Sequence, residues 1–274
     1  MRKIRECFLK VLLWGSIVIT LGMLIFILSY IFIKGIKVLS FDFLLKDYSP
    51  LGDGGVMPMV ITTLYMVGLS ILVSTPIAIL AAIYLQEYAK QGKLVKTIRF
   101  ATECLSGIPS IVYGLFGAVF FVEYLNMGYS IIAGALTVSI IILPVIIRTT
   151  EESLKSVPNA YKEGSLGLGA TRLQTLYKVV VPSAVPGILA GTILAIGRVI
   201  GESAAILLTA GTVAKVPKSI FSSGRTLTVQ AYLVTKEAGA INEACAVGII
   251  LIVIVFLLNT LARYISRKIN KANY

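Results

Sequence analysis

The sequence predicts an all-α, polytopic membrane protein with six transmembrane helices. Hydrophobic residues make up 57% of the 274 residues and charged residues only 14%, whereas an average soluble domain carries about 25% charged residues. Long uncharged stretches recur along the chain, and each has the roughly 20 residues needed to cross a bilayer core. Lys and Arg are concentrated in the connections between these stretches, as in membrane proteins whose basic loops face the cytoplasm.

The uncharged stretches define the expected spans in chain order. They are Val11–Ile33, Val56–Leu85, Cys104–Val122, Tyr124–Ile147, Ser183–Gly211 (with Arg198 and Glu202 inside it) and Ala244–Ala262. The first has 23 residues without a charge, and it lacks the shorter core and small-residue cleavage site of a signal peptide. We therefore expect it to be retained as a helix.

The basic residues indicate how the spans are oriented. If the N-terminus is cytoplasmic, 17 Lys and Arg lie in inner segments and 7 in outer segments. The inner set is Arg2, Lys3, Arg5, Lys10, Lys90, Lys93, Lys96, Arg99, Arg148, Lys155, Lys162, Arg172, Lys178, Arg263, Arg267, Lys268 and Lys271, and the outer set is Lys34, Lys37, Lys46, Lys215, Lys218, Arg225 and Lys236. Because basic residues favour the cytoplasmic side, we expect a multi-pass protein of the cell (inner or plasma) membrane with both termini in the cytoplasm.

Three regions follow from this topology. Residues 1–55 would form an N-terminal tail, the first span and an outer loop, residues 56–264 a transmembrane core, and residues 265–274 a cytoplasmic tail. The outer loop runs from Lys34 to Gly55 and contains the turn formers Ser49-Pro50 and Gly52-Asp53-Gly54-Gly55. Within the core, residues 151–182 are too polar to span, and we expect short amphipathic helices at the cytoplasmic face.

Composition excludes several classes of function. A net charge of +12 would suggest nucleic-acid binding in a soluble protein, but here the basic clusters flank apolar runs, so we expect contact with membrane lipid and not with nucleic acid. The absence of His removes His-ligated metals and Ser-His-Asp catalysis. Cys7, Cys104 and Cys245 form no CxxC motif and are interpreted as inert apolar residues. No G-x-x-x-x-G-K-[ST] sequence occurs, so we expect no ATP site and no cofactor in this chain.

Residues 158–182 predict two short helices joined by a glycine turn. Pro158 suits the first turn of a helix, Gly167 and Gly169 would end it, Thr171 would N-cap a second helix, and Pro182 would end the unit before the next span. Small residues at positions 160, 164 and 165 leave the backbone open to a close partner. On the residues alone, an ordinary connecting loop with surface helices is the alternative.

Two charges lie inside the fifth expected span. Arg198 is near its middle, where a lone Arg costs about 2.5–3.5 kcal/mol on insertion scales. Glu202 follows four residues later on the same helical face and can offset that charge. The two residues form either a structural ion pair or part of a solvated pathway for an anion. Two Gly-x-x-x-Gly pairs in the same span, 187/191 and 197/201, would let helices pack closely within the chain or across a dimer.

The third expected span contains Gly107-Ile108-Pro109-Ser110, which predicts a kink or a break. A helix broken near the middle of the membrane can expose its backbone to a substrate, whereas a plain proline kink has only a packing role.

Residues 163–182 resemble the EAA signature of ATP-binding-cassette importer permeases. That signature reads Glu-Ala-Ala, three residues, Gly, nine residues, Ile-x-Leu-Pro. At the same spacing this chain has Glu163-Gly164-Ser165, Gly169, Val179, Val181 and Pro182, and its departures keep the size class of each position. The resemblance implies the type I importer permease fold, with Glu163, Gly164, Ser165, Gly169 and Pro182 in the coupling segment that sits in a cleft of an ATPase subunit.

Further runs between about residues 57 and 261 resemble the phosphate importer permeases of the PstA type. They are Ile83–Ala89, Gly107–Gly117, Leu143–Glu152 and Gly197–Ala204. Sulfate and molybdate relatives typically continue the last Gly-Glu with a Phe-Gly-Ala sequence, whereas here Ser203-Ala204-Ala205 follows.

The resemblance implies a permease subunit that moves inorganic phosphate inward and has no ATPase site of its own. It implies three kinds of partner: a homologous second permease, an ATPase dimer that binds ATP-Mg, and an extracytoplasmic phosphate-binding protein. The residues we expect on the substrate path are Arg198, Glu202, Ser203, Pro109 and Ser110. The alternatives are a permease for another oxyanion, such as sulfate or molybdate, and an ATP-independent ion-coupled transporter, which would more commonly show an internal repeat and several acids deep in its spans.

Overall fold

The apolar stretches form long helices in the computed structural model, which describes residues 2–49 and 54–272. No strand occurs among these residues. Five helices are long and apolar enough to cross a membrane, and a sixth span is present if one bent pair of helices counts as a single span. The predicted all-α membrane fold is therefore confirmed.

Long spanning helices alternate with short ones along the chain. In order, the α-helices are α1 (Arg2–Gly35), α2 (Phe41–Leu45), α3 (Met57–Ile83), α4 (Lys93–Gly107), α5 (Ser110–Gly117), α6 (Ile131–Lys155), α7 (Asn159–Gly167), α8 (Arg172–Thr175), α9 (Val181–Gly201), α10 (Ala204–Thr209), α11 (Leu227–Leu233) and α12 (Ile241–Ala272). Four π-helical segments extend some of them: η1 (Tyr84–Tyr88), η2 (Ala118–Tyr124), η3 (Leu176–Val180) and η4 (Val234–Ala238).

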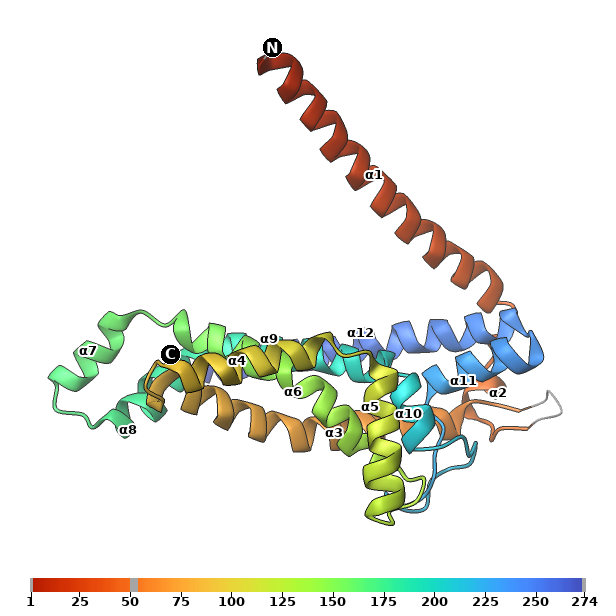
Figure 1. Cartoon of the computed structure of the whole chain (residues 1–274). Helices are drawn as coiled ribbons and strands as arrows, with labels where there is room; N and C mark the ends of the chain where they lie inside the picture. The colour runs from red at the N-terminus through yellow and green to blue at the C-terminus, as the bar shows by residue number, and fades with distance from the viewer. Residues whose placement is uncertain (1, 50–53, 273–274) are drawn as a thin grey trace.

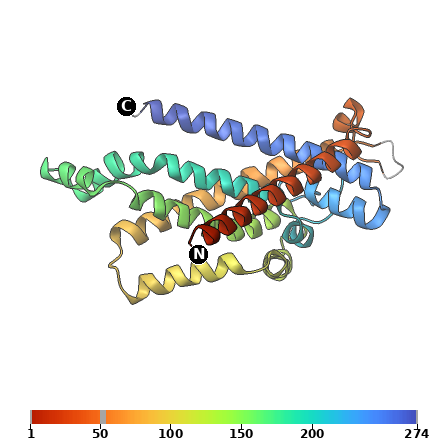
Figure 2. The same cartoon turned by 90° about the horizontal axis from the view of Figure 1, so that it is seen from above.

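Helices α3, α6, α9 and α12 lie side by side and form the body of the molecule (Figure 1). The main core between them contains fully buried Met66, Ile142, Ala195 and Val199. Figure 1 places α7 and α8 at one end of this bundle, which we call the α7 end, and places α2 and α11 at the opposite end. Figure 2 shows α12 along one side of the bundle and α4 along the other.

Close packing of α6 and α9 explains one of the two glycine pairs. A Cβ added at Gly187 would collide with Ser153 of α6, and one at Gly191 would collide with Thr149. This pair therefore packs within the chain, as small residues do between membrane helices. Gly197 and Gly201 have open space where a side chain would lie.

Helix α1 leaves the bundle at an angle (Figure 1). It packs against α12, where Gly35 meets the backbone of Cys245 and Ala246, while none of the residues in its membrane-spanning window is buried within the chain. Its apolar side chains are therefore available to lipid or to another protein chain.

The third expected span, Cys104–Val122, is wrong as a single helix. It begins at Lys93, and its two parts, Lys93–Ser106 and Ser110–Tyr124, meet at an angle of 97°. The break lies at the predicted Gly107–Pro109 position, since Ile108 and Pro109 have extended ψ values of 132° and 138°. Pro109 cannot donate a helical hydrogen bond, and a residue that precedes a proline disfavours the helical region.

The fourth and fifth expected spans also need new boundaries. The fourth starts at Ile131 and not at Tyr124, because Asn126 and Gly128 adopt positive φ values and Ser130 N-caps the helix. The fifth was expected to be continuous from Ser183 to Gly211, but α9 ends at Gly201, Glu202 is extended, and α10 begins at Ala204. Pro182 does not separate the second short helix from this span, because residues 172–201 run as one long helix.

The remaining connections are partly helical. The segment expected to be an outer loop, Lys34–Gly55, contains α2, which Ser40 N-caps through a hydrogen bond from the Phe43 amide. Of the turn formers predicted there, Pro50, Gly52 and Asp53 lie outside the described residues. At the other terminus, α12 continues to Ala272 and includes most of the expected tail.

Candidate functional site

The breaks in the third and fifth spans lie against each other. Tyr113, just after the first break, and Ala205, just after the second, are buried in one small apolar cluster with Ile141. Gly114 of α5 lies so near α10 that an added Cβ would approach the Ala205 Cα to 2.8 Å. Two segments that are about 90 residues apart in sequence thus place their non-helical backbone in one region.

Arg198 lies in the last turn of α9, close to the second of these breaks. Its side chain is exposed, and it makes no ion pair or hydrogen bond with any residue that the structure describes. It lies near Tyr113. The Tyr113 hydroxyl itself donates to the Leu105 carbonyl at 2.7 Å, so it bridges the break in the third span.

Glu202 is held differently from the sequence-based expectation. Its side chain is nearly buried, and Oε1 accepts hydrogen bonds from the backbone amides of Ser203 at 3.1 Å and Ala205 at 3.3 Å. The Glu202 carbonyl accepts from the Thr228 hydroxyl of α11 at 2.8 Å. The expected partnership with Arg198 is therefore not formed, because the helix that would align the two side chains ends one residue before Glu202.

The other expected path residues also lie at the breaks. Pro109 is the N-cap residue of α5 and is exposed, and Ser110 is half-buried at its first position. Ser203 is the N-cap residue of α10 and is half-buried. All five residues therefore belong to two neighbouring helix breaks, with Arg198 as the cation among them.

The segment that resembles the EAA signature projects from the α7 end of the bundle. None of the residues of α7 is buried. Glu163 and Gly164 are exposed, and an added Cβ at Gly164 would meet nothing within 4 Å. The large apolar side chains of Tyr161, Leu166 and Leu168 are exposed as well, Leu168 to 91%. Such a surface is typical of one that another protein covers.

The predicted helix, turn and helix are confirmed in this segment. Helix α7 ends at Gly167, and Gly169 has a left-handed φ of +87°. Thr171 N-caps α8 in a capping box with Gln174, in which each side chain accepts from the other residue's backbone amide. Ser165 and Thr175 join the two helices through a hydroxyl pair at 2.9 Å. Pro182 is half-buried near the start of α9.

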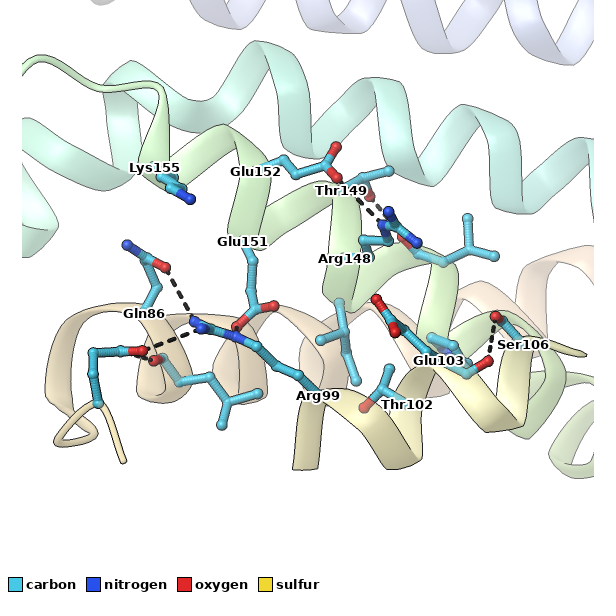
Figure 3. Close-up of a pocket in the computed structure, with 15 residues that line it drawn as sticks. Gln86, Arg99, Thr102, Glu103, Ser106, Arg148, Thr149, Glu151, Glu152 and Lys155 are labelled. Carbon is cyan, nitrogen blue, oxygen red and sulfur yellow. Dashed lines mark hydrogen bonds and ion pairs between the residues drawn. The ribbon is translucent and has the colours of Figure 1, made fainter. Parts of the chain in front are cut away.

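Sequence reasoning missed a polar cavity of about 790 Å³ between η1, α4 and α6 (Figure 3). Its α4 wall carries Arg99, Thr102, Glu103 and Ser106, and its α6 wall carries Arg148, Glu151, Glu152 and Lys155. Arg99 Nε binds Glu151 at 3.2 Å, and Arg148 Nε binds Glu152 at 3.3 Å. The charges on the walls are thus largely paired with each other.

A helical spacing in the sequence could have revealed this cavity. The polar residues of each wall recur at intervals of three, four and seven positions, which places them on one face of a helix. The basic residues at 93, 96 and 99 indicated a loop when they were weighed only by charge. Cys104, which is exposed, is absent from the cavity lining.

The residues at the helix breaks and in the EAA-like segment can bind ligands or partners. Among the described residues no group of three or more His, Cys, Asp or Glu side chains could hold a metal ion. The exposed guanidinium of Arg198 can bind an oxyanion through paired N–H donors. The exposed hairpin of residues 159–180, which we call the α7 hairpin, can bind a partner protein.

Comparison with known families gives one match over most of the chain. The family described as "Binding-protein-dependent transport system inner membrane component" matches residues 74–271. This region includes both helix breaks, the polar cavity and the α7 hairpin.

Two similar proteins show the range of names among the relatives. A "Probable ABC transporter permease protein YqgI" of Bacillus subtilis is 37% identical over 268 residues, covering 91% of each chain. The "Phosphate transport system permease protein PstA" of Pasteurella multocida is 38% identical over 210 residues, covering 76% of this chain and 75% of the relative.

Solved structures with the same fold are more distant in sequence. A chain of a bacterial alginate ABC transporter, in complex with its alginate-bound periplasmic protein, superposes with a TM-score of 0.73 at 17% identity, covering 97% of this chain and 96% of that one. A chain of the MetNI methionine ABC transporter in an inward-facing conformation gives a TM-score of 0.60 at 20% identity, covering 78% and 94%. The fold is that of the type I importer permeases.

Proposed function

Since the chain belongs to the family of binding-protein-dependent transport system inner membrane components, and is thus a permease subunit of an ATP-binding-cassette importer, we propose that it carries inorganic phosphate inward. The observation that carries this proposal is the exposed Arg198 beside two helix breaks. Relatives of 38% identity that bear the name of phosphate transport permeases support phosphate among the oxyanions.

Membrane energetics favour a role for Arg198 on the substrate path. An Arg that faces lipid costs about 2.5–3.5 kcal/mol at the centre of a membrane helix. Arg198 lies in the last turn of α9, beside the break inside the fifth expected span, and no described residue neutralises it within the chain. It must therefore face water, a partner or an anion. Phosphate carries one to two negative charges at neutral pH and needs compensation in a low-dielectric path. A guanidinium supplies a permanent charge and two parallel donors suited to phosphate oxygens.

The proposed assembly supplies what this chain lacks. A homologous second permease would cover the open side of the helix breaks. Two ATPase subunits, which bind ATP-Mg, would receive the α7 hairpins, and an extracytoplasmic phosphate-binding protein would deliver the anion to the opposite end. In this arrangement the α7 end lies in the cytoplasm together with both termini, as the excess of Lys and Arg in the inner segments favours.

Uptake by the complete complex tests the substrate. We expect proteoliposomes with the phosphate-binding protein and ATP to accumulate radiolabelled phosphate, and a hundredfold excess of sulfate or molybdate to compete weakly. If sulfate or molybdate is accumulated and phosphate is not, the chain is a permease for that oxyanion. If phosphate accumulates equally without ATP, the chain is an ion-coupled transporter.

A further inference from the structure

One ion pair joins α7 to a segment outside residues 159–180. Lys162 Nζ lies 2.6 Å from Glu87 Oε1 of η1. Within the part of the chain that the structure describes, this is the only ion pair or side-chain hydrogen bond that joins α7 to anything outside its own hairpin of residues 159–180. A displacement of α7 therefore acts on η1 through these two side chains.

Gln86, the neighbour of Glu87 in η1, contacts α4 instead of α7. Gln86 accepts a hydrogen bond from Arg99 Nη2 at 3.4 Å, and Gln91, just beyond η1, accepts from Nη1 at 3.1 Å. The remaining guanidinium nitrogen of Arg99 binds Glu151 of α6. All three guanidinium nitrogens are thus occupied (Figure 3). The segment η1 therefore contacts α7 through Glu87 and α4 through Gln86.

Helix α4 connects this network to the helix breaks. It runs without interruption from Lys93 to Gly107, so Arg99, near its middle, and Leu105, in its last turn, belong to one continuous helix. The Leu105 carbonyl accepts from Tyr113 across the break, and Tyr113 lies near Arg198. A rigid helix therefore separates the Arg99 network from the region of Arg198.

The Lys162–Glu87 pair is better shielded than an ordinary surface pair. Its side chains are 22% and 18% exposed, whereas those of Lys46–Asp42 are 55% and 74% exposed and those of Arg148–Glu152 are 63% and 66% exposed. Exposed pairs contribute little, because water screens them. A shielded pair resists separation, since each partner alone would leave a partly buried charge.

We propose that Glu87 is a positioning residue that, through Lys162, transmits movement of the α7 hairpin to η1, α4 and the helix breaks. The inference rests on the proposed function, because it takes an ATPase subunit as the source of the movement. The π-helical form of η1 accords with this role, since such segments frequently occur at functional sites.

The movement of α4 can be measured directly. Ser106, on the cavity face of α4, is changed to Cys in a chain whose Cys7, Cys104 and Cys245 are changed to Ala. The complex with its partners is reconstituted, and the rate of thiol labelling is compared with and without a non-hydrolysable ATP analogue and Mg²⁺. We expect nucleotide to change this rate by about tenfold, a size typical of coupled sites.

Three variants separate coupling from stability. The double change Glu87→Gln with Lys162→Gln removes the link without leaving an unpaired charge, so we expect assembly to persist while the nucleotide effect falls below about twofold and uptake is lost. The exchange Glu87→Lys with Lys162→Glu should restore most of both. Asp42→Asn, which removes an exposed pair at the opposite end, should change neither.

The outcomes also separate this inference from the proposed substrate. If the double-neutral variant keeps the full nucleotide effect, or if the exchanged pair is no better than the double-neutral variant, Glu87 does not transmit the movement. If the unmutated complex responds to nucleotide yet carries no phosphate, only the substrate assignment fails. If the unmutated complex shows no nucleotide response at all, the proposed ATPase coupling and this inference both fail.

Discussion

The guanidinium of Arg198 and the carboxylate of Glu202 are held in different ways, and this difference decides which of them can serve an anion. Both backbone amides that donate to Glu202 lie at the start of α10, so this carboxylate stabilises the break. Arg198 has no such partner among the described residues and is exposed. An anion can therefore reach Arg198 without first displacing a carboxylate.

Replacing Arg198 tests this assignment. We expect Arg198→Gln to abolish phosphate uptake, at least about a hundredfold, while the subunit still inserts and assembles, because Gln removes the charge and its five N–H donors. Arg198→Lys keeps the charge but loses the planar fork, so we expect partial activity. The measurements are initial rates of uptake and the amount of assembled complex in the membrane.

Glu202→Gln is the matched control for this experiment. The amide oxygen of Gln can still accept from Ser203 and Ala205, so we expect assembly and most of the uptake to persist. Glu202→Ala leaves two amides without their acceptor and should cost about 1–3 kcal/mol of stability. Near-normal uptake by Arg198→Gln combined with Glu202→Gln would show that Arg198 does not serve the anion.

At the scale of single elements, the helix breaks and turns form the candidate site, and they differ in how well the local sequence predicts them. Gly169 and Thr171 belong to local patterns, a left-handed glycine and a capping box, that act over three or four residues. The end of α9 depends instead on Thr228, which donates to the Glu202 carbonyl from 26 residues away. Periodicity predicts one helix over residues 183–211 because no local residue forbids it.

The glycine turn between α7 and α8 carries a prediction at this scale. An added Cβ at Gly169 would meet no atom of the chain within 4 Å, but the φ of +87° would cost a non-glycine residue about 1–2 kcal/mol. We expect Gly169→Glu to leave the subunit in the membrane and to abolish ATP-driven uptake, because a long charged side chain would obstruct the surface of the partner ATPase. Uptake and co-purification of the ATPase subunit are measured together.

Gly169→Asn separates strain from obstruction. Asn tolerates the left-handed conformation better than other non-glycine residues and is shorter than Glu, so we expect this variant to keep most of its uptake. If Gly169→Glu itself keeps both uptake and the bound ATPase, residues 163–182 are only a connecting loop.

For the whole molecule, hydropathy identified the fold class but not the shape of the interrupted spans, and six spans are reached only if the bent pair counts as one. The boundaries of α3 follow the uncharged stretch closely, whereas α12 continues past the expected Ala262 to Ala272. Helix α4 was missed because Lys93, Lys96 and Arg99 suggested a loop, although Lys93 and Lys96 are exposed on the helix and Arg99 lies on the face that lines the cavity. A charge count alone cannot distinguish a loop from a helix that faces an aqueous cavity.

The contacts that join the cavity walls to η1 could not be predicted, for a related reason. They depend on Gln86, Arg99 and Glu151, which come from three separate elements. No single segment shows that these side chains meet. The break at Pro109 and the cation at Arg198 were predictable, because a proline after Gly107-Ile108 and a charge inside an apolar run are each visible on their own.

The orientation of the whole molecule in the membrane is the last prediction. With 17 Lys and Arg in the segments of one side and 7 in those of the other, we expect the α7 end and both termini to lie in the cytoplasm. Single cysteines at Lys37 and Lys218, both exposed, should react with a membrane-impermeant thiol reagent in intact cells, whereas cysteines at Lys93 and Lys268 should react only after the membrane is opened. Gly54 is less suitable as a probe, because an added Cβ would collide with the backbone of Ser49. Labelling at Lys93 in intact cells would show that the topology is inverted. The exposed α7 hairpin would then lie outside and could not bind a cytoplasmic ATPase.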